Sequence, residues 1–93
     1  MHATPGKNKG EWTRFQHLLD DQMEWPSEFV FKFIVPQAGL NELKAVFGLH
    51  PIQERASRAG NYVSITARMQ MHSSTEIIAV YKAAAAVKGV ILL

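Results

Sequence analysis

The stretch GNYVSITARMQM, residues 60–71, decides the fold of this chain. Apolar and polar side chains alternate along it, which predicts a strand with one buried face and one wetter face. The turn-forming residues 57–61 precede this strand, and Ser73 with Glu76 after it has the spacing of a helix-capping box. The buried parity holds Val63, Ile65, Ala67, Met69 and Met71, and the wetter parity holds Tyr62, Ser64, Thr66, Arg68 and Gln70.

The composition is that of one small globular domain. The chain has 93 residues, 47% of them hydrophobic, and it contains no Cys. This length predicts a single domain, and the lack of Cys excludes disulfide bonds and thiolate chemistry. No apolar run approaches about 18 residues, the length that a membrane helix needs. We therefore expect a soluble, cytoplasmic protein with no membrane contact.

The formal net charge of +2 is unevenly distributed along the chain. Residues 1–28 carry three basic and five acidic side chains, whereas residues 29–93 carry seven basic and three acidic ones. An acidic N-terminal arm thus precedes a mildly basic core. A net charge this small does not by itself predict nucleic-acid binding.

The N-terminal region predicts a tail followed by a helical arm. Residues 1–10 are almost devoid of apolar side chains, which predicts a disordered tail. Trp12, Phe15, Leu18 and Leu19 then recur at helical spacing. Because a helix this short is marginal in water, we expect an arm over residues 11–24 to dock on the domain, which spans residues 11–93.

The remaining elements follow from the same periodicities. Residues 29–35 alternate but are too apolar for an edge, so they predict a central strand. Residues 40–47 predict a helix, residues 52–57 a polar edge strand, residues 77–87 a second helix and residues 90–93 a last strand.

The order β-α-β-β-α-β after the arm predicts an α+β domain. Right-handed crossovers then give a four-stranded antiparallel sheet in the order 4-1-3-2, with both helices on one face. This architecture is the ferredoxin-like plait.

Several local patterns carry a family likeness. Residues 18–21 (LLDD), the pair Trp25-Pro26, residues 29–32 (FVFK) and residues 57–62 (SRAGNY) resemble the YbeD-like family of small bacterial proteins of unknown function. The likeness covers residues 15–93 and departs from the family in a shorter first helix. It implies the same plait, similar in shape to ACT-type small-molecule regulatory domains, and it implies no catalytic residue.

No motif in the sequence predicts catalysis. His50 and His72 are expected at one end of the sheet and could begin a metal site, but no third ligand has a fixed spacing to them. Asp20 and Asp21 form a carboxylate pair that we interpret as a solvated helix end. We therefore predict no enzyme activity, no metal and no cofactor.

The wetter face of the sheet is the first candidate for binding. It would show the candidate interaction residues Val30, Lys32, Ile34, Tyr62 and Arg68. A half-apolar surface usually has a covering element or a partner. The acidic arm could cover this face by placing Trp12 and Phe15 against Lys32 and Arg68. Alternatively, a second copy of the chain could cover it in a homodimer. RNA binding is an alternative hypothesis for this face, although it offers only one stacking aromatic.

The second candidate binding site lies at one end of the sheet, where three connections should meet. These connections are residues 36–39, 57–61 and 87–89. Free amides at a helix start attract anions, and basic side chains flank them. The predicted ligand-binding residues are Gly39, Asn41, Arg55, Arg58, Gly60 and Lys88. The sequence thus favours a non-enzymatic regulatory or interaction module that binds a small anionic metabolite or a protein partner, with RNA binding as the alternative.

Overall fold

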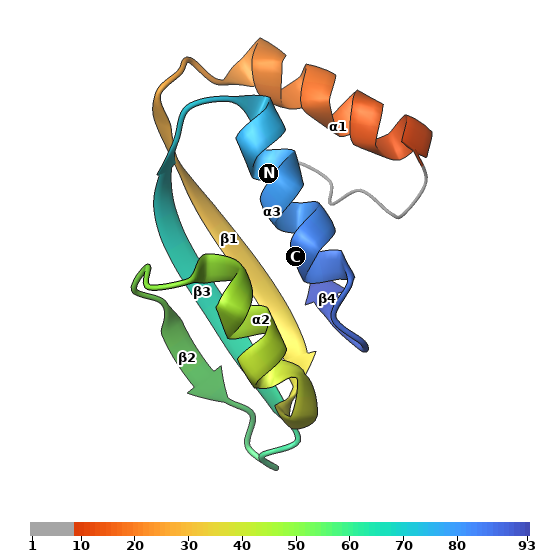
Figure 1. The fold of residues 1–93 in the computed structure, drawn as a ribbon, viewed down its shortest axis with the longest axis vertical. Coiled ribbons are helices and arrows are strands. Elements are labelled where there is room, and N and C mark those ends of the chain that lie inside the picture. The colour runs from red at the N-terminus through yellow and green to blue at the C-terminus, as the bar shows by residue number, and fades with distance from the viewer. Residues whose placement is uncertain (1–8) are drawn as a thin grey trace.

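The computed structural model describes residues 9–93, within which it has three α-helices, one short 3-10 helix and four strands (Figure 1). The order of these elements confirms the predicted order. Of the tail predicted over residues 1–10, residues 1–8 lie outside the described part, and the last two residues belong to the first helix. The elements are α1 (Lys9–Gln22), β1 (Ser27–Pro36), η1 (Gln37–Gly39), α2 (Leu40–Phe47), β2 (Gln53–Ala56), β3 (Tyr62–Met71), α3 (Ser74–Ala85) and β4 (Ile91–Leu92).

The four strands form one antiparallel sheet in the order β2-β3-β1-β4, which is the predicted order read from the other edge. The two central strands pair over ten residues, from Ser27 opposite Met71 to Pro36 opposite Tyr62. The edge strands are shorter: β2 has four residues and β4 has two. The ferredoxin-like plait is therefore confirmed, with its two long apolar strands in the centre.

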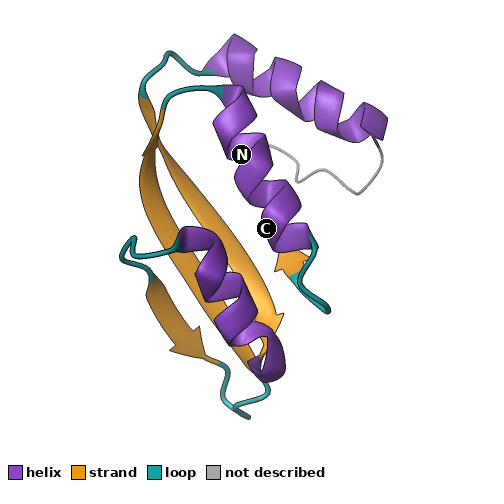
Figure 2. Cartoon of the chain, viewed as in Figure 1, coloured by secondary structure: helices purple, strands orange, loops and turns teal. Residues whose placement is uncertain are grey.

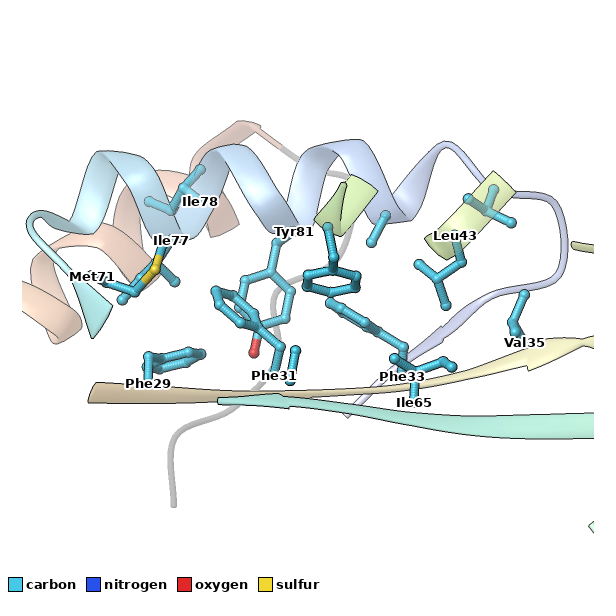
Figure 3. Close-up of a cluster of buried hydrophobic side chains, with 14 of the residues drawn as sticks. Phe29, Phe31, Phe33, Val35, Leu43, Ile65, Met71, Ile77, Ile78 and Tyr81 are labelled. Atoms are coloured by element: carbon cyan, nitrogen blue, oxygen red, sulfur yellow. The ribbon is translucent and has the colours of Figure 1, made fainter. Parts of the chain in front are cut away.

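The hydrophobic core lies between the sheet and the helices, as the edge-on view of Figure 3 shows. Tyr81 of α3 is at its centre and is only 1% exposed. Its ring meets Phe15 edge-on at a centroid distance of 5.3 Å and Phe33 at 5.6 Å. Burial raises the pKa of Tyr81 to about 12.

The start of α3 has the predicted cap with one difference. Ser73 Oγ accepts a hydrogen bond from the Glu76 N–H at 3.2 Å. The Glu76 carboxylate, however, accepts from the N–H of His72 at 2.9 Å, one residue before the capping Ser. Both bonds satisfy backbone donors at the point where β3 passes into α3.

Helix α1 docks on the helical layer, beside α3 (Figure 1). Trp12, Phe15 and Leu19 are buried, and the ring centroids of Trp12 and Tyr81 lie 6.4 Å apart. The Nζ atom of Lys82 lies 5.8 Å from the centroid of the Trp12 ring. The prediction that the arm docks on the domain is thus confirmed for this helix.

The alternative in which the arm covers the other face of the sheet is wrong. Its aromatic side chains do not lie against Lys32 and Arg68, because they pack on Tyr81 across the sheet from them. Among the described residues, no helix has the length and apolarity that crossing a membrane requires.

Candidate functional site: the open face of the sheet

The sheet presents one face without a covering helix in the described part of the chain, and we call it the open face. Odd-numbered residues of β1 and β3 point into the core, so the even-numbered ones point to the open face. The register adds the residues of the edge strands that lie opposite these. The open face comprises Glu28, Val30, Lys32, Ile34 and Pro36 from β1, Tyr62, Ser64, Thr66, Arg68 and Gln70 from β3, Gln53 and Arg55 from β2, and Ile91 with Leu93 at the β4 edge.

All five residues that the sequence predicted for an interaction face lie on the open face. Val30 and Arg68 are directly opposite each other, and Ile34 is opposite Ser64. Tyr62 lies one row further along β3, within reach of Ile34 on the diagonal. The structure therefore brings these residues together on one surface, whereas their role in binding stays a prediction.

An apolar patch lies on the open face over β1, β4 and the first residue of β3. Ile91 is 48% exposed and Leu93 is 53% exposed, while Tyr62 is 46% exposed. Ile91 pairs with Ile34, and the N–H of Leu93 donates to the carbonyl oxygen of Lys32 at 3.0 Å. We define the apolar patch by its members, which are Val30, Ile34, Tyr62, Ile91 and Leu93.

Two of these residues, Ile91 and Leu93, were missed by the sequence analysis. Residues 90–93 are apolar at every position, so the run has no alternation from which its two faces could be separated. Only the pairing of Phe33 with Leu92 shows that Leu92 faces the core and that its two neighbours face outward.

A groove of about 560 Å³ crosses the open face beside the apolar patch. Its walls include the side chains of Lys32 and Arg55, and Ser64 and Thr66 lie between these two. Leu93 closes the groove on the β4 side.

The open face is net positive. It carries three basic side chains, Lys32, Arg55 and Arg68, and one acidic side chain, Glu28, which gives a formal charge of +2. Glu54 also lines the groove, but its carboxylate lies 2.8 Å from the Nζ atom of Lys44 on α2. Because Glu54 pairs with Lys44, it does not neutralise the basic side chains of the open face, which keeps its net positive charge.

The second predicted site, for a small anion, is only partly assembled. Its connections do meet at one end of the sheet (Figure 2): the N–H of Gln37 donates to the carbonyl oxygen of Asn61 at 3.0 Å. Gly39 is also in close contact with the last connection, because a Cβ atom there would lie 3.0 Å from Val87 Cγ1 and 3.7 Å from the carbonyl oxygen of Lys88. Asn41 follows in the first turn of α2, and Gly60 lies in the turn between β2 and β3.

The basic residues predicted for this anion site are spread apart. Arg55 lies on the open face, opposite Ser64. Arg58 lies in the connection after β2 and Lys88 in the connection before β4, and about three strand spacings, roughly 14 Å, separate these two edge strands. The N–H of Leu40, among the amides expected to be free, donates to the carbonyl oxygen of Gln37. Anion binding at this end stays a prediction.

The histidine pair at the other end of the sheet does not form a ligand cluster. The Nε2 atom of His50 lies 2.8 Å from the carbonyl oxygen of Arg68 and forms a hydrogen bond with it. Within residues 9–93, no group of three His, Cys, Asp or Glu side chains comes close enough to hold a metal ion.

Comparison with known proteins gives a family but no function. A family model described as "Protein of unknown function (DUF493)" matches residues 20–93, which include the whole sheet, α2 and α3 and exclude most of α1. The comparisons with curated proteins and with solved structures found no match. The predicted YbeD-like likeness is consistent with this result. The chain therefore belongs to the DUF493 family of proteins of unknown function.

Proposed function

We propose that this protein is a non-enzymatic, cytoplasmic interaction module whose open face docks a protein partner. The observation that carries the proposal is the exposure of Tyr62, Ile91 and Leu93, each between 46% and 53%, on the sheet face that α1 leaves uncovered. Apolar side chains gathered on one surface and bordered by polar ones are typical of protein interaction sites. We call this role regulatory because the protein would act by binding a partner and not by catalysing a reaction.

The charge of the open face favours a different protein over a second copy of this chain. Two copies packed face to face would bring together two surfaces of formal charge +2 each. Like charges across an interface oppose association, whereas a partner with acidic side chains would be attracted. An acidic surface with apolar side chains therefore fits this face best.

RNA binding has weaker support from the same surface. Plait domains that bind RNA stack bases on aromatic side chains of the two central strands. Here Tyr62 is the one aromatic side chain among the described residues of the open face, and its neighbours Val30 and Ile34 are aliphatic. Basic side chains without stacking platforms favour an acidic protein over a nucleic acid.

A photo-crosslinking experiment in cells tests the proposal. The photoreactive amino acid p-benzoylphenylalanine replaces Tyr62 in one variant and the exposed Ala79 of α3 in a matched control. We expect a protein adduct from the first position alone, identified by mass spectrometry, and we expect Ile91→Asp to abolish it while the thermal melt stays close to that of the parent. The side chain of Ile91 is half exposed, so this substitution removes surface and little core.

Four results would overturn the proposal. Adducts with RNA would indicate the nucleic-acid alternative, and adducts with a second copy would indicate a homodimer. Equal adducts at both positions would show contact without specificity, and no adduct at either position would show that the open face docks nothing.

A further inference from the structure

We infer that the open face contains a carboxylate-binding subsite, built from Lys32, Arg55, Ser64 and Thr66, which takes an acidic side chain of the docked partner. The inference rests on the proposed function and adds the chemistry of the contact. It joins residues that the sequence analysis had assigned to two separate sites, because the register of β2 moves Arg55 to the open face.

The strand register places two cations on either side of two hydroxyl groups. Lys32 on β1 is opposite Thr66 on β3, and Arg55 on β2 is opposite Ser64, two residues earlier on the same strand. Because neighbouring strands lie about 4.8 Å apart, the two strands that carry the cations are roughly 10 Å apart, and the offset of two residues along the strands brings the separation of the two Cα atoms to about 12 Å. Both side chains are long enough to reach a carboxylate placed over β3 between them.

The groove provides the volume that such a ligand needs. Its volume of about 560 Å³ and its lining by all four residues place the open space directly over the hydroxyl groups. Leu93, 53% exposed, forms an apolar wall beside it. A carboxylate on a short side chain, next to an apolar residue, would occupy the groove and the apolar patch together.

The polar groups of the subsite are available for a ligand within the described part of the chain. Neither Lys32 nor Arg55 takes part in an ion pair there, and neither hydroxyl group takes part in a side-chain hydrogen bond there. Glu54, an acidic side chain that lines the groove, is paired with Lys44 at 2.8 Å. A bound carboxylate would thus face two cations and two O–H donors, and the one acidic side chain among the described residues that line the groove, Glu54, already has Lys44 as its partner.

The strength of the contact follows from its partial exposure. Charge-assisted hydrogen bonds are about twice as strong as neutral ones, but solvent weakens exposed ion pairs. We therefore expect the loss of either cation to weaken binding by about tenfold, a factor between those for buried and fully exposed pairs.

A peptide titration followed by amide NMR tests the subsite in the full chain. The probe is the blocked pentapeptide acetyl-Leu-Glu-Leu-Glu-Leu-amide, and the matched control peptide has Gln in place of each Glu. We expect the Glu peptide to shift the amide resonances of Lys32, Arg55, Ser64 and Thr66 together, and the Gln peptide to bind about tenfold more weakly or worse. Glutarate, a free dicarboxylate without apolar side chains, and a uridine decanucleotide complete the set of ligands.

Substitutions then assign the effect to the two cations. Lys32→Ala and Arg55→Ala should each weaken binding of the Glu peptide by about tenfold. Arg14→Ala on α1, which removes the same charge from an exposed site on the helical layer, should leave the affinity unchanged. The double variant Lys32→Glu with Arg55→Glu should reject the Glu peptide and bind a version with Lys in place of Glu.

Each contrary result has a distinct meaning. Equal affinities for the Glu and Gln peptides would overturn the subsite and leave apolar docking intact. The same conclusion would follow if the Tyr62 crosslink survives the double charge reversal of Lys32 and Arg55 but is lost in Ile91→Asp. Glutarate binding as tightly as the peptide would indicate a small-molecule site instead of a docking subsite. Tighter binding of the oligonucleotide, or no binding of any ligand, would also overturn the inference. If the parent chain gives no protein crosslink from position 62, by contrast, the result counts against the proposed function.

Discussion

Replacing Phe15 with alanine tests whether α1 is part of the core or an appendage to it. The Phe15 ring is 3% exposed and meets the Tyr81 ring edge-on, with an interplanar angle of 81°. Truncation of a buried Phe to Ala costs about 3–5 kcal/mol, of which roughly 0.5–1.5 kcal/mol comes from the aromatic pair. Against a total stability of about 5–15 kcal/mol, this loss is large.

Urea unfolding followed by circular dichroism at 222 nm measures the effect, because α1 contributes to the helical signal. The matched control is His17→Ala, an exposed position on the same helix, which should change the free energy of unfolding by no more than about 0.5 kcal/mol. A loss below about 1 kcal/mol for Phe15→Ala would refute the reasoning. So would a separate early loss of helical signal, since α1 would then unfold independently of the sheet.

Three further predictions concern the core and one turn. Ile65→Ala, at a site with 0% exposure, should cost about 2–5 kcal/mol in urea unfolding, and a loss under half a kcal/mol would mean that the faces of β3 are inverted. Because burial raises the pKa of Tyr81 to about 12 from its ordinary value near 10, the stability that its neutral form contributes is complete below about pH 10 and should be lost as pH rises through about 12, by up to about 3 kcal/mol. Absorbance at 295 nm in the single-tyrosine variant Tyr62→Phe should show this late ionisation, and a midpoint near pH 10 would contradict it. Gly89→Ala should destabilise the fold by about 1–2 kcal/mol or more, since Gly89 has φ of 80° and an added Cβ would lie 2.8 Å from Pro36 Cγ; an unchanged melting temperature would count against this turn.

The sequence predicted the sheet because both central strands carry a clear period of two. Residues 62–71 alternate fully, and the Phe-rich strand places Phe29, Phe31 and Phe33 on one parity, so the buried faces follow without any structure. A register shift of one residue would expose the whole set, which fixes the pairing strongly.

The candidate site was less predictable because its residues lie on strands without such a pattern. β2 is polar at three of its four positions, so its sequence has no alternation that separates its two faces. The sequence therefore does not show that Arg55 lies on the open face with Lys32, and only the pairing of Arg55 with Ser64 shows it. The helical stripe of Trp12 and Phe15 predicts burial, but periodicity in one element does not specify which surface covers it. Contact with Tyr81 decides this, and it depends on the position of α3.

The most direct test of the account is whether the open face is bare in the free protein. Selective labelling of isoleucine δ1 methyl groups gives NMR signals from both layers, and a soluble paramagnetic agent broadens those that solvent reaches. We expect Ile91, 48% exposed, to broaden strongly, and Ile65 and Ile77, both 0% exposed, to stay sharp at every protein concentration tested. If Ile91 is protected to the same degree as Ile65, then a second copy or residues outside the described part cover this surface, and the open face is not free to dock a different protein.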